Sequence, residues 1–458
     1  MKKLISNFII LLSTTLLIKI LNFAKEVELS IFYGTGTIVD NYVKLSIFPN
    51  LILNSIGPAL GIYFLTKITQ SKNNTLAIDF KKIVLVSVLL LLLAISNSLY
   101  LTNENFTILI NSNVLIFLYL IQVVLVYYHQ SFENFKTGAL SSSIQALTIL
   151  IVIFIGYIMN LHDLIFYSIT IALIIQITIL CVSIKMKNYN VTIINSKDKD
   201  FFKGIISIIL GIGLIEVLSF ITKYFIGLFP DNGYLSIFNY SYKLANLPNS
   251  IIVFSFISII FPKLSKISKG DILIKLNGKL TNVIISTLTL FSIVCIIFSK
   301  SIVKLVYGNG VFSNKDLNLV SLTFDILMCV MIFVSVLTIQ YRVLFLLKKF
   351  RIIIINSIFQ ITILVLLSVF SVQITNSYID LYYGILITTF LGVSINYLFI
   401  NIKDIWIVLV TLVAILIILL LSNVLANCVI FVLFMIMLII EMKNIKKGRF
   451  NYNNETVN

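Results

Sequence analysis

Long apolar runs recur along the chain, and they constrain its fold more than any other feature. A mainly apolar stretch of about 20 residues is long enough to cross roughly 30 Å of hydrocarbon as a helix. The connecting segments are too short to form a separate domain. We therefore expect an all-α membrane protein. Its predicted spans, about fourteen in number, lie near residues 4–24, 36–65, 83–101, 107–127, 138–160, 163–184, 204–229, 234–261, 281–299, 317–341, 352–372, 379–401, 405–422 and 424–440.

The composition excludes a globular fold in water. Charged residues make up 11% of the chain and hydrophobic residues 59%, whereas soluble domains carry roughly 25% charged residues. The formal net charge of +16 does not indicate nucleic acid binding, because the lysines lie in short loops between apolar runs. The four cysteines all lie inside apolar runs and lack the spacing of metal ligands. We expect no metal, no cofactor and no nucleic acid partner.

The distribution of basic residues predicts the orientation of the chain. If the N-terminus is cytoplasmic, both tails and the predicted cytoplasmic loops hold 26 of the 34 Lys and Arg residues. Such an excess is typical of cytoplasmic loops, so we expect a multi-pass protein with both termini in the cytoplasm. Eight basic residues fall elsewhere, and the first five of them lie in or beside spans: Lys19, Lys25, Lys44, Lys223, Lys243, Lys300, Lys304 and Lys315.

An internal repeat divides the chain into two halves. The sequence K-L-S-I-F-P-N at 44–50 recurs as K-L-A-N-L-P-N at 243–249, 199 residues later, and the predicted spans keep nearly the same offset. Two six-helix bundles related by a pseudo-two-fold axis along the membrane normal would enclose a central cavity, as in many transporters. The expected parts are an N-terminal bundle at 1–190, a C-terminal bundle at 200–402, a helix pair at 403–442 and a cytoplasmic tail at 443–458.

Polar stripes mark the same two helices of each half. A charged side chain at the centre of a bilayer costs roughly 2.5–3.5 kcal/mol, so such residues pair or line a watery cavity. The candidate cations of that cavity are Lys19, Lys25, Lys44 and Lys243, and the candidate gating acids are Glu26, Asp40 and Glu216. Asp40 and Lys44 stand at i and i+4, close enough to pair. On the seventh and eighth spans the stripes are Glu216, Ser219 and Lys223, and Asn239, Lys243, Asn246 and Ser250.

Prolines inside predicted spans are candidate kinks. Pro49 and Pro248 each follow a repeat-matched lysine by five residues, and Pro58 follows Gly57. Proline removes a backbone hydrogen bond from a helix and bends it. Helices bent beside a cavity could act as gates, and for Pro58 a static packing kink is an equal alternative.

Three stretches of the chain resemble one family of membrane proteins. The first is F-A-K-E-V-E-L-S-I-F-Y-G-T-G at 23–36, followed by Asp40 and by a Pro-Asn pair at 49–50. The others are F-N-Y-S-Y-K-L-A-N-L-P at 238–248 and V-Y-G-N-G-V-F at 306–312. Together with the helix number, they resemble the MurJ (MviN) lipid II flippase family, within the superfamily of multidrug, oligosaccharidyl-lipid and polysaccharide exporters.

The resemblance implies a flippase rather than an enzyme. Such a protein moves an undecaprenyl-pyrophosphate-linked saccharide across the bacterial cytoplasmic (inner) membrane by alternating access, powered by membrane potential or a monovalent ion. By position, Lys19, Lys25 and Lys243 correspond to cavity arginines of the family, and Glu26 and Asp40 to cavity acids. The last two helices would form a groove for the lipid tail. The expected partners are the substrate, membrane lipids and proteins of cell-envelope or glycan synthesis, and we expect a monomer.

The chain also departs from the family pattern. Lysines replace all of the cavity arginines, which keeps the charge and loses bidentate recognition of phosphate. Leu53 and Asn54 replace an arginine pair, Pro58 replaces a glutamate, and Tyr242 replaces an aspartate before the cation of the eighth span. These changes leave open which lipid-linked glycan is carried.

Several functions therefore remain open at this point. The first is a flippase for lipid II or a related lipid-linked oligosaccharide, and the second is a flippase for O-antigen or capsular repeat units. An ion-coupled multidrug exporter fits less well, because the repeat-matched intramembrane residues are lysines and not acids. A glycan polymerase or ligase would need a large outer loop, which the sequence lacks.

Overall fold

The structure is a computed structural model of the chain. Its described part is almost entirely helical, which confirms the predicted class of helical membrane protein. Apart from residue 411, the predicted C-terminal helix pair and tail lie outside the described residues. The structure describes residues 2–61, 75–78, 80–102, 104–131, 134–185, 190–193, 209–210, 213–230, 233–250, 270–347, 349–400 and 411.

The chain forms two compact units. The first unit comprises Met1–Ile209 together with two short segments, Pro230–Ser236 and Asn309–Phe312. The second unit comprises Leu210–Phe229, Ile237–Gly308 and Ser313–Asn458. The two short segments belong to the first unit because they pack on the ends of its first two helices, as described below.

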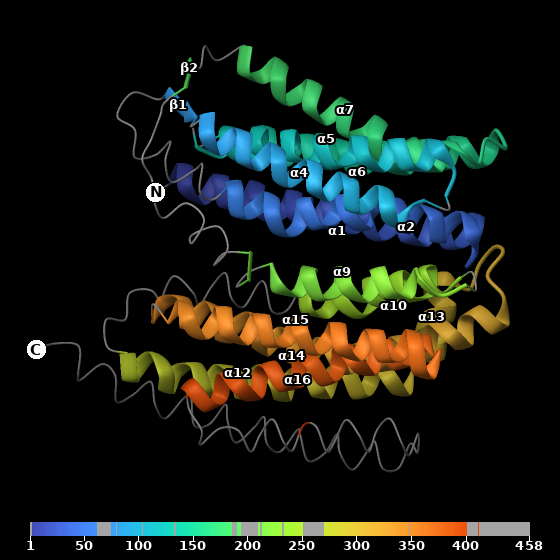
Figure 1. The fold of residues 1–458 in the computed structure, drawn as a ribbon, viewed down its shortest axis with the longest axis vertical. Helices are drawn as coiled ribbons and strands as arrows, with labels where there is room; N and C mark the ends of the chain where they lie inside the picture. The colour runs from blue at the N-terminus through green and yellow to red at the C-terminus, as the bar shows by residue number, and fades with distance from the viewer. Residues whose placement is uncertain are drawn as a thin grey trace, which may run out of the picture. The chain divides into compact units, whose positions relative to one another are not determined.

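The first unit is a bundle of long apolar helices (Figure 1). Buried polar contacts join these helices. Helix α6 packs against α1 and α7, and α5 packs against α2, α4 and α7. The Ser112 hydroxyl donates to the carbonyl of Leu45 over 2.7 Å, which ties α5 to α2. Inside a bilayer the hydrophobic effect does not drive helices together, so hydrogen bonds between helices help to determine which helices pack against each other. The helices are α1 (Lys2–Tyr33), α2 (Thr37–Leu51), η1 (Ile52–Ile56), α4 (Phe80–Tyr100), α5 (Phe106–Ser131), α6 (Phe135–Ile158) and α7 (Leu164–Lys185).

The second unit is built around one buried helix, α14. It packs against α12, α13, α15 and α16, and most of its residues from Val320 to Leu344 are buried, as expected of a helix in the middle of a bundle. An amide network joins its neighbours: Asn356 donates to Asn396 over 2.8 Å, and Asn396 donates to Gln340 over 3.0 Å. The helices are α9 (Leu214–Ile226), α10 (Tyr234–Pro248), α12 (Gly270–Ile297), α13 (Ser299–Tyr307), α14 (Asn314–Leu346), α15 (Phe350–Phe370), η3 (Ser371–Thr375) and α16 (Tyr378–Ile400).

A short parallel ribbon departs from the all-α expectation. Strand β1 (Thr75–Ile78) pairs with β2 (Asn190–Ile193), with Thr75 opposite Asn190 and Ile78 opposite Ile193. Both strands lie in loops that the lysine distribution assigns to the cytoplasm. The β-branched residues of both segments, Thr75 and Ile78 in one and Val191, Thr192 and Ile193 in the other, favour an extended conformation. The ribbon joins two loops that are far apart in the sequence.

The helices able to cross a membrane agree with part of the predicted set. Six of the described helices are long and apolar enough, and a seventh span results if the bent pair α12 and α13 counts as one. The predicted span near 281–299 falls within α12, which starts earlier and stops at Ile297, where the chain turns by 74° into α13. The count of fourteen stays a prediction.

Candidate functional site

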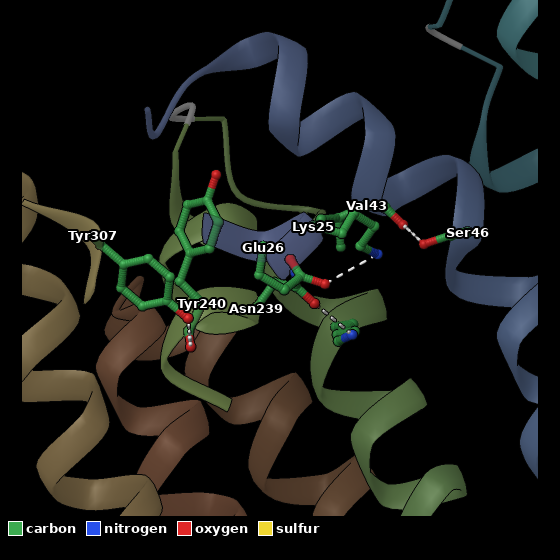
Figure 2. A network of polar contacts seen from close by, with 8 residues as sticks. Lys25, Glu26, Val43, Ser46, Asn239, Tyr240 and Tyr307 are labelled. Carbon is green, nitrogen blue, oxygen red and sulfur yellow. Dashed lines mark hydrogen bonds and ion pairs between the residues drawn. The ribbon is translucent and has the colours of Figure 1, made fainter. Parts of the chain in front are cut away.

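Lys25 and Glu26 form a buried ion pair in the C-terminal part of α1. The Lys25 Nζ lies 3.1 Å from the Glu26 Oε1, and the Glu26 side chain is 1% exposed (Figure 2). The Lys25 ammonium also lies over the ring of Tyr42 on α2, 5.4 Å from the ring centre. A buried charge needs such compensation, since an uncompensated one costs several kcal/mol. The sequence marked both residues as candidates, but it did not predict their contact with Tyr42.

Asp40 caps the first turn of α10. Its carboxylate accepts the backbone N–H of Gly233 over 2.5 Å and that of Ser236 over 2.8 Å, and all three residues belong to the first unit. Helix N-termini leave backbone N–H groups unpaired and favour negative charge. Asp40 was expected to pair with Lys44, one turn along α2. The structure instead engages its two oxygens with a segment 193 residues away in sequence.

Lys44 has a different partner, Glu104. The Lys44 Nζ lies 2.8 Å from the Glu104 Oε1, and both side chains are mostly buried. The expected pairing with Asp40 is therefore wrong for this structure, because Glu104, just before α5, lies closer to the ammonium. Lys19, the other candidate cation of α1, is half-buried.

The predicted polar stripe of α9 faces α10 within the second unit. Lys223 donates to the Asn239 Oδ1 over 3.2 Å and lies over the ring of Tyr242, 5.9 Å from its centre. Tyr242 also interacts electrostatically with Glu216 on α9. Each half thus places a lysine of its first helix over a tyrosine of its second helix. This internal likeness accords with the sequence repeat.

Lys243 differs from the other candidate cations. Its side chain is exposed, whereas those of Tyr242, Leu244 and Ala245 around it are buried. It makes no hydrogen bond or ion pair with any residue that the structure describes. Asn246 and Ser250, on the same stripe, are half-buried. An accessible ammonium beside neutral polar groups can exchange its water for an anion at little cost.

The repeat-matched prolines precede stretches of wider helix. Pro49 lies in the last turn of α2, and the chain continues as the π-helical segment η1. Pro248 ends α10, and residues 249–250 are again π-helical. Proline removes one backbone hydrogen bond, which allows the next turn to widen, and π-helical turns occur often at functional sites. Pro58 follows η1 by two residues and is half-buried.

Two further contacts escaped the sequence reasoning. Gly310 lies in the left-handed region with φ of 75°, and a Cβ there would overlap the carbonyl of Ile31 at the end of α1. The N–H of Val311 donates to that carbonyl over 3.2 Å. Asp325, for which the sequence offered no partner, interacts electrostatically with Lys300 of α13. Only the glycine-rich composition of 306–312 signalled any of these contacts in advance.

Comparisons with known proteins agree on one family. A family model described as lipid II flippase MurJ matches residues 42–457. No curated protein matches the chain in a sequence comparison. Among solved structures, "Lipid II flippase MurJ, inward closed conformation" superposes with a TM-score of 0.73 at 17% identity, over 96% of this chain and all of that one.

A second solved structure shares the fold more distantly. It is the inward-facing conformation of a multidrug resistance MATE family transporter of the MOP superfamily, with a TM-score of 0.60 at 13% identity. The match covers 87% of this chain and 98% of that one. Because the family model spans nearly the whole sequence and the fold follows the same family, this multi-pass membrane protein belongs to the lipid II flippase MurJ family.

Proposed function

We propose that this protein flips a polyprenyl-diphosphate-linked saccharide, lipid II or a related lipid-linked oligosaccharide, by alternating access. The observation that carries the proposal is the exposed ammonium of Lys243 in a polar stripe of α10, which has no partner among the residues that the structure describes. A diphosphate that leaves water must exchange its hydration for cationic hydrogen-bond donors. Lys243 is ready to donate without first breaking a contact inside the described part of the protein.

Lys25 and Lys44 would join the site by exchanging partners. Each is held by one carboxylate in this structure, Lys25 by Glu26 and Lys44 by Glu104. These acids keep the ammonium groups compensated while no substrate is bound. An arriving diphosphate would compete for the same donors. Lys19 and Glu216 would contribute charge at the margins of the site.

The remaining features follow from the same proposal. We place the protein in the bacterial cytoplasmic membrane with both termini inside, on the strength of the lysine distribution. We propose coupling to the membrane potential or a monovalent ion, because the chain lacks an ATP-binding loop. Pro49, Pro58 and Pro248 would supply the bends for opening and closing. The protein would act as a monomer beside enzymes of glycan or cell-envelope synthesis.

One alternative rests on a specific feature, the replacement of arginine by lysine at the candidate site. A guanidinium binds phosphate with two parallel hydrogen bonds, whereas an ammonium acts as a point charge. Tyr242 also stands where the family pattern has an acid. These differences favour a substrate with another headgroup arrangement, such as an O-antigen or capsular repeat unit. A multidrug exporter remains the weaker alternative.

Transport by purified protein decides between these substrates. The protein would be reconstituted into vesicles with fluorescent lipid II or with a lipid-linked repeat unit, and exposure of the headgroup on the opposite leaflet followed over time. The proposal expects flipping of at least one of them, accelerated by an imposed potential. Transport of neither, by protein that is folded and inserted, would contradict it.

A further inference from the structure

Helix α13 turns away from the spanning direction of its neighbour. The chain bends by 74° between Ile297 and Ser299, so that α12 and α13 are two arms of one broken helix. Spanning helices tilt by about 20° on average from the membrane normal. If α12 spans the bilayer, α13 runs closer to the plane of the membrane than to its normal. In the proposed topology it lies on the extracytoplasmic side.

The two faces of α13 have different chemistry. The buried face consists of Ser299, Val303 and Tyr307 at intervals of four residues. Tyr307 anchors this face, since its hydroxyl donates to the carbonyl of Tyr240 over 3.2 Å (Figure 2). The other face presents Lys300, Lys304 and Leu305, whose side chains are exposed.

Apolar side chains flank the lysines on the accessible face. Leu305 is 81% exposed, and Phe298, at the bend, is 56% exposed. A large apolar side chain in this position gains free energy by entering the acyl boundary of the bilayer. A short helix with lysines beside leucine and phenylalanine is typical of helices that lie in the membrane interface.

Basic charge gathers at this place. The three basic residues that fall in predicted outer loops, Lys300, Lys304 and Lys315, all belong to α13 or to the first turn of α14. None of them makes a hydrogen bond or ion pair with a described residue. Two carboxylates lie nearby: Asp316 is engaged in a capping box with Ser313, and Asp325 on α14 interacts electrostatically with Lys300. The three lysines outnumber these two acids. The local field is therefore positive, on the side of the membrane where lysine is otherwise scarce.

We propose that the α13 lysine surface, made of Lys300, Lys304 and Lys315 with Phe298 and Leu305, binds anionic phospholipid headgroups in the outer leaflet. The lysines supply charge-assisted donors to phosphodiester oxygens, and the two apolar side chains enter the acyl region beside them. None of its residues is among the proposed substrate cations. Lipid binding at this surface would hold α13 at a constant depth in the membrane while α12 and α14 move.

A fluorescent probe at Leu305 tests the proposal directly. The single tryptophan, Trp406, is replaced by phenylalanine, and Leu305→Trp introduces a reporter at the exposed position. The protein is reconstituted in mixed phosphatidylglycerol and phosphatidylcholine vesicles, with bromine quenchers on the chains of one lipid or the other. Phe298→Trp serves as a second reporter if the first variant does not fold. This experiment needs neither substrate nor transport.

The proposal expects stronger quenching by brominated phosphatidylglycerol than by brominated phosphatidylcholine. Lys300→Gln with Lys304→Gln should lower this preference by about fivefold for each lysine removed. The matched control, Lys136→Gln with Arg351→Gln, removes two exposed charges from the predicted cytoplasmic side and should leave it unchanged.

Three results would overturn the proposal. Equal quenching by both lipids would show that the lysines do not bind anionic lipid in preference to neutral lipid. Absence of quenching would show that the reporter on α13 lies in water. Displacement of phosphatidylglycerol by a small fraction of polyprenyl diphosphate would assign the surface to the transported lipid instead.

Discussion

At the scale of single residues, Asp40 has the clearest structural role. Its carboxylate satisfies two backbone donors at the start of α10, and its side chain is 5% exposed. Buried N–H groups without an acceptor cost about 1–3 kcal/mol each. The aspartate thus fixes the segment Pro230–Ser236 to α2 inside the first unit.

Replacing Asp40 should destabilise the protein in a graded way. Asp40→Ala removes both acceptors and should lower the free energy of unfolding by about 2–4 kcal/mol. Asp40→Asn keeps one acceptor oxygen and should cost about half as much. Thermal unfolding in detergent, followed by light scattering, ranks the thermal stabilities of the unmodified protein and the two variants. Equal stability of all three would show that the cap contributes nothing.

The ion pair of Lys44 and Glu104 gives a second prediction at this scale. Both side chains retain some exposure, 22% and 16%, so solvent screening limits their coupling to the order of 1 kcal/mol. A double-mutant cycle with Lys44→Gln and Glu104→Gln should show that energy as non-additivity of the two stability losses. Additive losses would mean that the two groups do not interact. Lys25 and Glu26, which are adjacent and more deeply buried, should couple more strongly.

At the scale of elements, a glycine turn fixes α1 to a distant segment. Gly310 has φ of 75°, and any side chain there would meet the carbonyl of Ile31. Gly36, which precedes α2, is extended with φ of −163°, and a Cβ there would meet nothing within 4 Å. A side chain would therefore strain the backbone and clash with a neighbour at Gly310, and would do neither at Gly36.

The pair provides a matched test of that difference. Gly310→Ala should lower thermal stability by at least 1–2 kcal/mol, from the left-handed conformation alone, with the clash in addition. Gly36→Ala should change it by less than about 1 kcal/mol, because neither strain nor overlap arises. Melting temperatures of the two variants in one detergent would decide this. A larger loss at Gly36 than at Gly310 would contradict the described contacts.

Local patterns predicted the elements better than the contacts between them. Apolar runs placed the spans because hydrocarbon thickness sets their length, and the repeated K-L-x-x-x-P-N marked two helices that both widen after their proline. The bend into α13 was missed because Phe298 carries no proline or glycine signal. Lys44 was assigned a partner four residues away, but its partner Glu104 is 60 residues away.

At the scale of the whole molecule, the family and the fold accord with the sequence analysis. The resemblance rested on short motifs at 23–50, 238–248 and 306–312, and the contacts explain why these motifs matter. Gly310 packs on α1, and Asp40 caps the helix that carries Lys243. Charges from different stripes acquire partners only when the chain folds. Their pairing could therefore not be read from spacing along one helix.

The most direct test of the central claim is the flipping rate of the Lys243→Gln variant in reconstituted vesicles. Loss of one charge-assisted contact, worth about 1.5–3 kcal/mol, should reduce the initial rate by about ten- to a hundredfold. Lys243→Arg should restore most of it, and Lys136→Gln, an exposed lysine at the start of α6, should not change it. An unchanged rate for a folded, inserted Lys243→Gln protein would contradict the account.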